Sequence, residues 1–515
     1  MDDAGFTIED EAALADTLRI TRLAGLSPLD YDRCRTAEAA EMGCRTSTLD
    51  DLVQAARNAG RDGTSGTAAT AGGAPIPPAF TEESLALRFA AIHAGRLRYV
   101  AAWGRWMQWD GAVWRADGTL QAFDLARAIC REASAECNDP SVAACLAAAR
   151  TVAAVLRLAK ADRRHAATID QWDADPWVLN TPGGVVDLRS GQIRSHRPAD
   201  CLTKITAVTA DGECPLWRGF LAKVTAGNQE LQLFMQRMAG LALTGITRDH
   251  ALFFAYGTGG NGKGVFLNTI TSILNSYAAI ANMETFTASQ NDRHPTDLAM
   301  LRGARLVTAQ ETEEGRRWAE SRIKAITGGD PITARFMRMD FFTYVPQFKL
   351  MIAGNHRPGL RNVDEAIRRR FHLIPFDVTI AAAERDEALP DKLRAEWPGI
   401  LAWMIDGCLL WQERGLAPPV AVQDATADYL AAEDAMGLWM EECCTQTSTF
   451  YATSGALFGS WKAWAEAAGE QAGSQKRFSQ ALQARGFDPK REGHTGKPGF
   501  IGIGIRPPES DRHYG

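Results

Sequence analysis

The sequence has no long apolar segment and no signal-like N-terminus. None of its 515 residues lies in an apolar run of about eighteen or more, the length that a membrane-spanning helix needs. The first residues, Met1-Asp2-Asp3-Ala4, are acidic and lack the basic and then apolar plan of a secretory signal. We therefore expect a cytoplasmic protein with no membrane partner.

Metal-binding cysteine patterns and a strong net charge are also missing. The ten cysteines are scattered, and the close pair Cys443-Cys444 is too tight for metal-ligand spacing. This pattern indicates reduced thiols rather than a zinc site. The formal net charge is only −6, which does not exclude nucleic acid, because binding depends on where basic groups cluster.

The N-terminal third shows how the chain is divided. A chain of this length predicts more than one domain, because single cores stop growing at roughly 250–300 residues. Residues 1–59 have the pattern of short amphipathic helices. Residues 60–79 contain too few large apolar groups to order themselves, which predicts a flexible linker. In 99–118, tryptophans flank Asp110-Gly111, which predicts a hairpin whose tryptophans serve packing rather than base stacking.

One segment has the pattern of a phosphate-binding loop. Residues 252–256 suit a buried strand, and apolar residues recur at helical spacing over 265–274. Between them, glycines let the backbone fold around phosphates at the positive end of a helix, and a lysine supplies charge for the β and γ phosphates. The candidate ATP-binding residues are Gly257, Thr258, Gly259, Gly260, Asn261, Gly262, Lys263 and Gly264.

The loop departs from the usual pattern at its last position. A Ser or Thr normally follows the lysine and places a hydroxyl on magnesium, whereas this chain has Gly264. The same glycines also fit G-x-G-x-x-G, so the loop alone leaves a dinucleotide site open as an alternative.

Polar residues end the next two apolar segments. The run 304–311 has the pattern of a second buried strand that ends in a carboxylate, Glu311, with Glu313 as a weaker candidate. A carboxylate there would orient the attacking water and help to hold the metal. The run 348–355 has the pattern of a third strand, and the amide of its last residue, Asn355, would hydrogen-bond the same water.

Three arginines, Arg368 to Arg370, complete the series at a helix end before a further strand. Guanidinium groups that reach across a subunit boundary stabilise the charge that develops in phosphoryl transfer. Each feature has an ordinary alternative: a solvated strand end, a turn residue or an exposed basic face. Together, the order of loop, Glu, Asn and Arg is that of an additional-strand ATPase. A dinucleotide fold explains none of the last three, so the series favours the ATPase.

These motifs resemble the helicase part of the phage and plasmid primase–helicase proteins, which belong to helicase superfamily 3 within the AAA+ class. The resemblance covers residues 80–380, and 80–240 are similar to the accessory domain that precedes the ATPase in that family. It rests on GTGGNGKG (257–264), RLVTAQETEEGRRWAESRIKAITGGDPITARF (305–336), FKLMIAGNHRP (348–358) and VDEAIRRRF (363–371).

The resemblance implies a hexameric ring that hydrolyses ATP with Mg²⁺ and moves 3′ to 5′ along single-stranded DNA. Lys263 would bind phosphate, and Glu311 would be the catalytic carboxylate and metal ligand. Asn355 would be the sensor, with Arg369 or Arg370 as the finger from the neighbouring subunit.

The resemblance also implies a hairpin that enters the central pore, within 324–340. Its basic and apolar side chains suit backbone contacts and base stacking, although a solvated basic hairpin is the alternative. The candidate DNA contacts are Lys324, Arg335, Arg338 and Met339, with Phe336 interleaved.

Two residues depart from the family pattern. Gln310 stands where many members have a second acidic residue, and Gly264 removes the usual metal hydroxyl. Both changes weaken magnesium coordination and leave open slow hydrolysis or metal binding through water and Glu311. The residues before 80 are too few for a polymerase-like palm, so we expect any primase to be a separate chain.

The C-terminal segment has the pattern of a winged helix. Two helical stretches, 457–469 and 475–486, precede a glycine-punctuated hairpin at 487–505. Lys476 and Arg477 begin the second helix, and further basic residues lie in the hairpin, which suits phosphate contacts with duplex DNA. A small protein-docking module is the alternative.

We therefore expect an α/β protein with a P-loop AAA+ ATPase core and a parallel sheet. The expected parts are an N-terminal helical region (1–59), a linker (60–79), an α+β accessory domain (80–240), the ATPase (241–395), a helical connector (396–445) and a winged-helix domain (446–515).

The expected function is that of an ATP-dependent DNA helicase of phage- or plasmid-type replication, acting on single-stranded and forked DNA as a homo-oligomeric ring. If a phage or prophage encodes it, it works in the bacterial host cytoplasm. The alternative is an ATP-switched DNA-binding initiator or loader that does not unwind DNA.

Overall fold

The computed structural model describes residues 19–61, 77–288, 296–310, 316–360, 363–491 and 496–506. The chain divides into two compact units, Met1–Pro77 and Pro78–Gly515, each with its own core. In the first unit, α2 (Pro28–Glu41) and α3 (Thr46–Arg61) are the short helices that the sequence predicts. They bury a cluster made of Leu23, Tyr31, Ala39, Leu49 and Val53.

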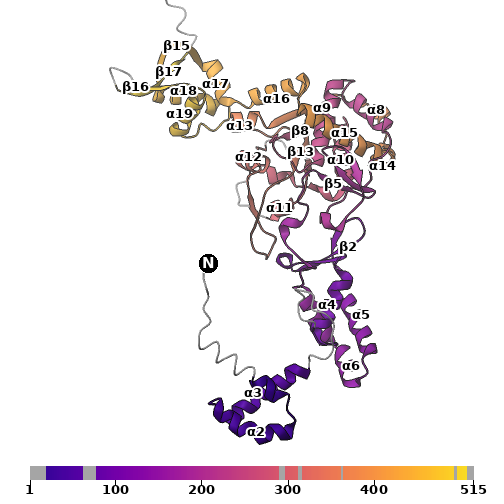
Figure 1. Ribbon diagram of the computed structural model, residues 1–515. Helices are drawn as coiled ribbons and strands as arrows, with labels where there is room; N and C mark the ends of the chain where they lie inside the picture. The colour runs from indigo at the N-terminus through magenta and orange to yellow at the C-terminus, as the bar shows by residue number, and fades with distance from the viewer. Residues whose placement is uncertain are drawn as a thin grey trace, which may run out of the picture. The chain divides into compact units, whose positions relative to one another are not determined.

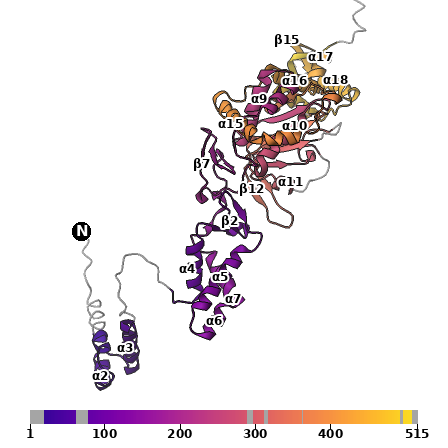
Figure 2. The same ribbon diagram turned by 90° about the vertical axis from the view of Figure 1, so that its right-hand side faces the viewer.

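The second unit begins with a group of helices and a small sheet. Figure 2 shows the four helices side by side, and buried residues such as Phe89, Ile129 and Val155 form their shared core. The helices are α4 (Glu82–His93), α5 (Gln121–Glu136), α6 (Pro140–Leu146) and α7 (Ala149–Ala159). The sheet has the order β3-β2-β1-β4, formed by β1 (Leu97–Val100), β2 (Arg105–Trp109), β3 (Trp114–Ala116) and β4 (Ala166–Ala167).

The hairpin predicted around Asp110-Gly111 is confirmed. Strands β2 and β3 are antiparallel and pair Trp109 with Trp114. The Asp110 carboxylate accepts hydrogen bonds from the backbone N–H groups of Ala112 and Val113 at 2.9 and 2.8 Å, which fixes the turn. Trp114 is buried against the neighbouring rings Trp109 and Trp172, so these tryptophans pack the core, as predicted.

A second small sheet and two helices lead into the central sheet. Strands β5 (Val178–Thr181), β6 (Gly184–Asp187) and β7 (Gln192–Arg194) form an antiparallel meander. Helices α8 (Pro215–Val224) and α9 (Gln229–Leu243) follow. Asn228 caps α9 by accepting a hydrogen bond from the N–H of Leu231 at 3.0 Å.

The central sheet has five parallel strands in the order β14-β8-β13-β10-β9. Numbered along the chain, this order is 5-1-4-3-2, so β13 lies between β10 and the strand before the glycine loop. Figure 1 shows β8 and β13 side by side. The strands are β8 (Leu252–Tyr256), β9 (Ala278–Ile280), β10 (Leu306–Gln310), β13 (Lys349–Gly354) and β14 (Phe371–Pro375). The parallel sheet is the one that the sequence predicts.

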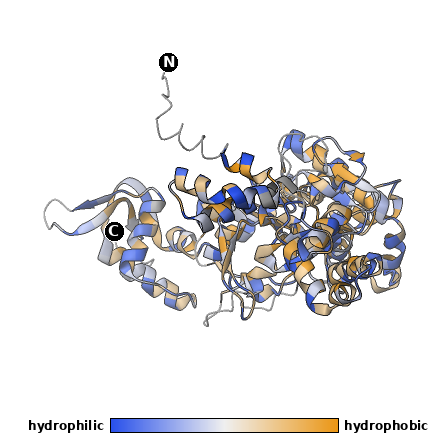
Figure 3. Ribbon diagram, turned by 60° about the horizontal axis from the view of Figure 1, so that its bottom comes forward, coloured by the Kyte–Doolittle hydropathy of each residue, from blue (hydrophilic) through white to orange (hydrophobic). Residues whose placement is uncertain are grey.

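Both faces of this sheet are buried, which explains why its strands are apolar runs rather than alternating ones. Along β8, Phe253 and Ala255 belong to one core cluster, and Leu252 and Phe254 belong to another on the opposite face. Orange and blue residues alternate along many helices of the protein, as expected for helices that bury only one side (Figure 3).

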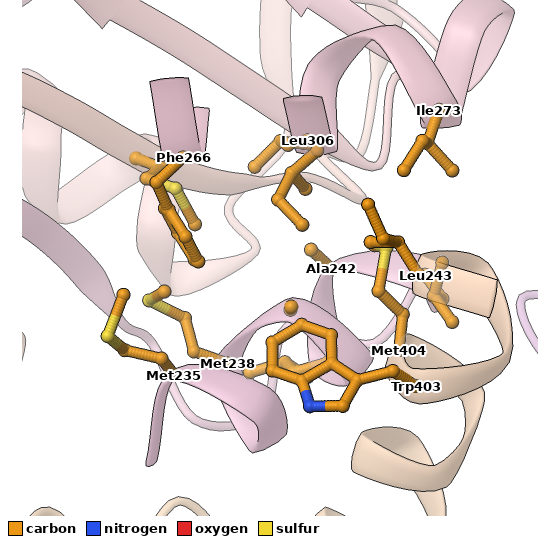
Figure 4. Close-up of a cluster of buried hydrophobic side chains, with 14 of the residues drawn as sticks. Met235, Met238, Ala242, Leu243, Phe266, Ile273, Leu306, Trp403 and Met404 are labelled. Atoms are coloured by element: carbon orange, nitrogen blue, oxygen red, sulfur yellow. The ribbon is translucent and has the colours of Figure 1, made fainter. Parts of the chain in front are cut away.

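The first face is covered by α9, α10 (Lys263–Leu274) and α15 (Trp397–Arg414). Their side chains meet β10 in one apolar cluster (Figure 4). Helices α9 and α15 approach closely at two glycines. A Cβ on Gly240 would lie 2.1 Å from the backbone N of Cys408, and one on Gly407 would lie 2.1 Å from the backbone O of Gln236. The segment expected as a connector, 396–445, thus supplies part of the core around the central sheet.

The opposite face is covered by α12 (Glu320–Gly328) and α16 (Val420–Ala432). Between β10 and β13 the chain also forms a hairpin of β11 (Ile332–Ala334) and β12 (Phe342–Tyr344). The short helix α13 (Glu365–Arg368) precedes β14, and α14 (Leu389–Ala395) follows it.

The C-terminal elements form a separate small core. Strands β15 (Cys444–Thr453), β16 (Pro489–Arg491) and β17 (Pro498–Ile505) make an antiparallel sheet in the order β15-β17-β16. Helices α17 (Ala435–Cys443), α18 (Ser454–Ala467) and α19 (Gln475–Ala484) pack on it. Along the chain the order is helix, strand, helix, helix, strand, strand, and the buried Trp439 of α17 belongs to the same core.

Among the described helices, none is by itself both long and apolar enough to cross a membrane. Helices α6 and α7, bent at 59°, meet the length and composition criteria only when they are taken together.

Candidate functional site

The glycine loop connects β8 to α10 and adopts a backbone that glycine favours. Gly259, Gly260 and Gly262 have φ values of +101°, +62° and +88°, a region that residues with a Cβ rarely occupy. Tertiary contacts also require two of the glycines. A Cβ on Gly257 would lie 2.4 Å from the backbone O of Phe376, and one on Gly262 would lie 2.6 Å from Val224 Cγ1. The loop is therefore held in one shape from both sides.

Lys263 is the first residue of α10, and its side chain returns across the loop. Its Nζ donates hydrogen bonds to the backbone O of Gly257 at 2.7 Å, to Asn261 Oδ1 at 3.1 Å and to Asn355 Oδ1 at 3.2 Å. All three acceptors are neutral. Lys263 is only 7 % exposed, and burial lowers the pKa of its ammonium. Among the described residues, Lys263 is therefore a buried cation with no paired anion, beside the N-terminus of a helix.

Asn355 follows β13 directly, and β13 lies beside β8 in the sheet. Parallel strands present their carboxyl ends at one edge, which is why residues 92 positions apart in sequence meet here. The structure thus brings together two of the predicted site residues, Lys263 and Asn355. Asn261 anchors the loop by donating from Nδ2 to the backbone O of Phe376 at 2.9 Å.

The third strand end supplies an amide. Gln310, the last residue of β10, donates from Nε2 to Asn268 Oδ1 on α10 at 2.7 Å. The predicted catalytic carboxylate Glu311 and its alternative Glu313 follow β10 but lie outside the described residues.

Three residues near the loop were not expected from sequence. Phe220 and Val224 of α8 contact Gly262, and the Arg385 guanidinium contacts Gly260, where its Nη2 lies 2.3 Å from the position of a Cβ. Arg385 is exposed and is held by Ile380, whose backbone O accepts from Nε at 3.0 Å. Phe220 and Val224 are ordinary apolar positions of a helix, so no sequence signal marked them.

The three arginines at the end of α13, Arg368 to Arg370, differ in their surroundings. Arg368 forms an ion pair with Asp434 at 3.7 Å. Arg370 is buried, and its Nε donates to Thr327 Oγ1 at 3.1 Å while Nη1 donates to the backbone O of Ala366 at 2.6 Å. Burial lowers the pKa of Arg370. Arg369 is exposed and forms no ion pair with any described residue, so it is the arginine that a second chain can reach.

The hairpin β11–β12 carries an apolar and basic tip. Phe336, Met337, Met339 and Phe341 are 38–68 % exposed. Arg338 lies among them with φ +62°. The guanidinium of Arg335 lies over the Phe341 ring at 4.6 Å. Side chains of this kind suit both backbone phosphates and base faces.

Lys324, predicted to contact DNA with this hairpin, lies instead on α12. It forms an ion pair with Asp364, the residue that caps α13. The structure therefore separates Lys324 from Arg335, Arg338 and Met339.

The C-terminal module also carries exposed basic residues. Lys476 and Arg477 lie in the first turn of α19, and Ser474 caps that helix by accepting from the N–H of Arg477 at 3.3 Å. A cavity of about 360 Å³ lies between α19 and the strands. Its lining includes Lys490, Arg491, Ser454, Ser479 and Gln483.

The donor set around the loop fits a polyphosphate. Lys263 offers a buried charge that no described anion pairs, and the positive-φ glycines shape a cradle that a side chain would fill. No group of three or more His, Cys, Asp or Glu residues with metal-binding geometry occurs in the described parts of the chain. Among the described residues, Asn355, Gln310 and Asn268 offer amide oxygens as metal ligands at the ends of these strands and on α10, and the predicted ligand Glu311 lies outside the described residues.

Together these features define an α/β protein with a parallel sheet and a phosphate-type loop at its edge. A family model described as "D5 N terminal like" matches residues 86–226, and one described as a family of unknown function (DUF5906) matches residues 255–370.

The curated proteins that the chain matches include viral ones. The chain is 23% identical over 282 residues to "Putative helicase L207/L206" of Acanthamoeba polyphaga mimivirus, covering 50% of this chain and 29% of the relative. It is 24% identical over 257 residues to "Putative helicase 022R" of Frog virus 3, covering 45% of this chain and 26% of the relative. The chain therefore spans less than a third of the length of these two relatives.

A solved structure, "The apo structure of NrS-1 C terminal region", is similar with a TM-score of 0.45 and 10% identity, covering 82% of this chain and 99% of that chain. The two matched regions and the viral relatives, which are named putative helicases, support the resemblance to phage-type primase–helicases that the motifs predicted.

Proposed function

We propose that this chain is the motor part of an ATP-dependent DNA helicase, of superfamily 3 within the AAA+ class, that works as a ring in phage- or plasmid-type replication. The observation that carries the proposal is the contact between Lys263 and Asn355 at the carboxyl edge of a sheet with the order 5-1-4-3-2. An additional strand between the loop strand and the next carboxylate-bearing strand is what an additional-strand ATPase requires.

The residues of the loop have distinct roles in this proposal. The N–H groups at the start of α10 and the Lys263 ammonium hold the β and γ phosphates. Without nucleotide, Asn355 accepts a hydrogen bond from Lys263 and holds it in place. When the lysine binds phosphate instead, Asn355 is free to orient the attacking water. Bound ATP and Mg²⁺ supply the leaving group and the charge that neutralises it.

Glu311 is the residue that we assign to activating water. The assignment is supported by Gln310, the residue before it in the chain, which ends β10 at the same sheet edge as Lys263 and Asn355. Because Gly264 has no hydroxyl, Glu311 and water molecules would supply most of the ligands of the metal ion.

The remaining parts act on DNA and on the neighbouring subunit. Arg369 reaches the nucleotide of an adjacent copy. It suits this role better than Arg370 because Arg369 is exposed and Arg370 is buried. The hairpin tip, with Arg335, Arg338 and Met339, contacts single-stranded DNA in the pore. The C-terminal module is a winged helix whose Lys476 and Arg477 contact duplex phosphates.

Unwinding of a 3′-tailed forked duplex with ATP and Mg²⁺ tests the proposal, with Lys263→Ala as the control. We expect strand separation by the wild-type chain alone. The variant Glu311→Gln should bind ATP and stop turnover, and normal hydrolysis by it would remove Glu311 from catalysis. DNA-stimulated hydrolysis without strand separation would favour an initiator or a loader. The basic C-terminal module would also suit such a protein, because it can bind duplex DNA.

A further inference from the structure

The short helix α13 is joined to α12 at both of its ends. At its start, Lys324 of α12 forms an ion pair with Asp364. At its end, Arg370 donates to Thr327 Oγ1 of α12 at 3.1 Å. Arg369, the arginine exposed to a second copy, lies between these two attachments in the chain.

Asp364 makes two contacts at once. One carboxylate oxygen accepts a hydrogen bond from the N–H of Ile367 at 2.9 Å and caps α13, while the other oxygen holds Lys324. Burial raises the pKa of the Asp364 carboxyl, but the hydrogen bonds from Lys324 and Ile367 outweigh it and lower the pKa below its ordinary value. The ionised carboxylate is therefore the form that these contacts favour.

Helix α12 leads directly into the hairpin. It ends at Gly328, and β11 begins at Ile332. Ile323 and Ile326 fix α12 in the core beneath the sheet. Two side-chain contacts and the three intervening backbone positions 329–331 therefore connect α13 to the base of the hairpin.

A third attachment joins α13 to the C-terminal module. Asp434 receives Arg368 at 3.7 Å and Arg485, the residue after α19, at 3.0 Å. The arginine run is consequently linked to each part of the chain to which we assign DNA binding.

We propose that α12 and α13 act as one coupling element that transmits the nucleotide state sensed by Arg369 to the hairpin at 335–341. Lys324 and Asp364 are positioning residues in this element. Lys324 is not a DNA ligand, because Asp364 neutralises its charge. The inference rests on the proposed helicase function, in which Arg369 senses the neighbour and the hairpin contacts DNA.

The test separates the charge of Asp364 from its cap. Asp364→Ser keeps a capping oxygen but removes the charge, because serine is as good an N-cap as aspartate. Lys324→Met removes the other charge and keeps an apolar stem. Arg88→Met breaks an ion pair of similar exposure, with Glu136, in the accessory helices and serves as the matched control.

In the full-length chain we would measure the factor by which single-stranded DNA stimulates ATP hydrolysis, and the affinity for that DNA at several salt concentrations. We expect Asp364→Ser and Lys324→Met each to lower the stimulation factor about two- to thirtyfold. The double variant should fall no further than either single one. The salt dependence of DNA affinity should match that of wild type, and Arg88→Met should behave as wild type.

Three results would overturn the inference. Weaker DNA binding by Lys324→Met alone, with a salt slope reduced by about one, would make Lys324 a DNA ligand. Full stimulation in both single variants would show that the ion pair transmits nothing. No stimulation of the wild-type chain would overturn the proposed function, and with it this coupling; thermal melting of each variant confirms that it is folded.

Discussion

Gly264 is the residue at which the phosphate loop differs from the usual pattern, and its surroundings allow the difference to be reversed. A Cβ at this position meets no heavy atom within 4 Å, and the residue lies in the first turn of α10. Gly264→Ser would place a hydroxyl next to Lys263, where a metal ligand is normally found. We expect the Mg²⁺ concentration for half-maximal hydrolysis to fall about tenfold, the effect of one good polar contact.

Gly262 provides the control for this substitution, since it lies in the same loop but has no room. Gly262→Ala would bring Cβ within 2.6 Å of Val224 and 2.9 Å of Phe220, at a φ of +88°. It should lose nucleotide binding. An unchanged Mg²⁺ requirement in Gly264→Ser would mean that the metal is held on the other side of the site.

His372 in β14 makes the stability of the sheet depend on pH. Its ring stacks on Phe253 at 5.5 Å, and burial lowers its pKa from 6.5 to about 4. Between these values the unfolded chain binds a proton that the folded chain rejects, so stability falls as pH drops from about 6.5 toward 4. At pH 5 the loss is about 2 kcal/mol relative to pH 7.

His372→Phe should remove this part of the pH dependence, which urea unfolding at pH 7 and pH 5 would measure. Phenylalanine keeps an aromatic ring against Phe253 and cannot be protonated. Equal loss of stability in the variant and in wild type would show that other groups carry the acid sensitivity.

The sequence alone predicts that Lys263 and Asn355 belong to the site. Lys263 ends a glycine-rich loop after an apolar strand, and Asn355 directly follows another apolar strand. The same reasoning could not choose between Arg369 and Arg370, since only the fold shows that Arg370 is buried against Thr327. Nor could it find Arg385, because contact with Gly260 depends on how the chain turns back after β14.

At the scale of elements, the hairpin β11–β12 is where a single residue can be tested for contact with DNA. Arg338 lies at its tip with φ +62°, a conformation that costs energy for any residue other than glycine. Arg338→Ala removes the side chain and keeps the strain, whereas Arg338→Gly removes both. We expect both variants to lower DNA-stimulated hydrolysis and to reduce the salt slope of DNA binding by about one.

The comparison of the two variants identifies the cause. If Arg338→Ala binds and responds to DNA as wild type does while Arg338→Gly does not, the strained backbone matters and the guanidinium does not. If neither variant differs from wild type, the hairpin does not contact DNA through this residue.

The sequence predicts that the helices exist, but it does not predict what they pack against. The segment 396–445 is helical, as the sequence indicates, but its first long helix packs on α9 through Gly240 and Gly407 and belongs to the core of the sheet. Its last helix, α17, contributes Trp439 to the C-terminal core. Apolar spacing shows that a helix has a buried face, but it does not show which partner buries it.

For the whole molecule, Lys263 and Arg385 contact the phosphate loop within one chain, whereas no described contact joins Arg369 or Arg370 to that loop. Lys263 approaches from the loop, whereas Arg369 faces outward and Arg370 is occupied by Thr327 and Ala366. This arrangement is what a motor requires if hydrolysis depends on a neighbouring copy, because each nucleotide then reports on two subunits.

Mixing two inactive variants tests this dependence directly. Lys263→Ala subunits have a defective loop but an intact arginine, and Arg369→Ala subunits have the reverse defect. If Arg369 acts across the boundary, a site in an Arg369→Ala subunit beside a Lys263→Ala neighbour is complete. Random assembly at equal concentrations makes about a quarter of the sites complete, so hydrolysis should return to roughly that fraction of the wild-type rate.

The control is a mixture of Lys263→Ala with Asn355→Ala. Both residues serve the same site in one chain, as their hydrogen bond at 3.2 Å shows. Every site in such a mixture therefore lacks one of the two, whichever subunit lies beside it, and no activity should return. Recovery in the first mixture and none in the second would require a site shared between chains, which a monomeric enzyme cannot provide. No recovery in either mixture would mean that Arg369 serves the site of its own chain and that each chain hydrolyses ATP with its own groups.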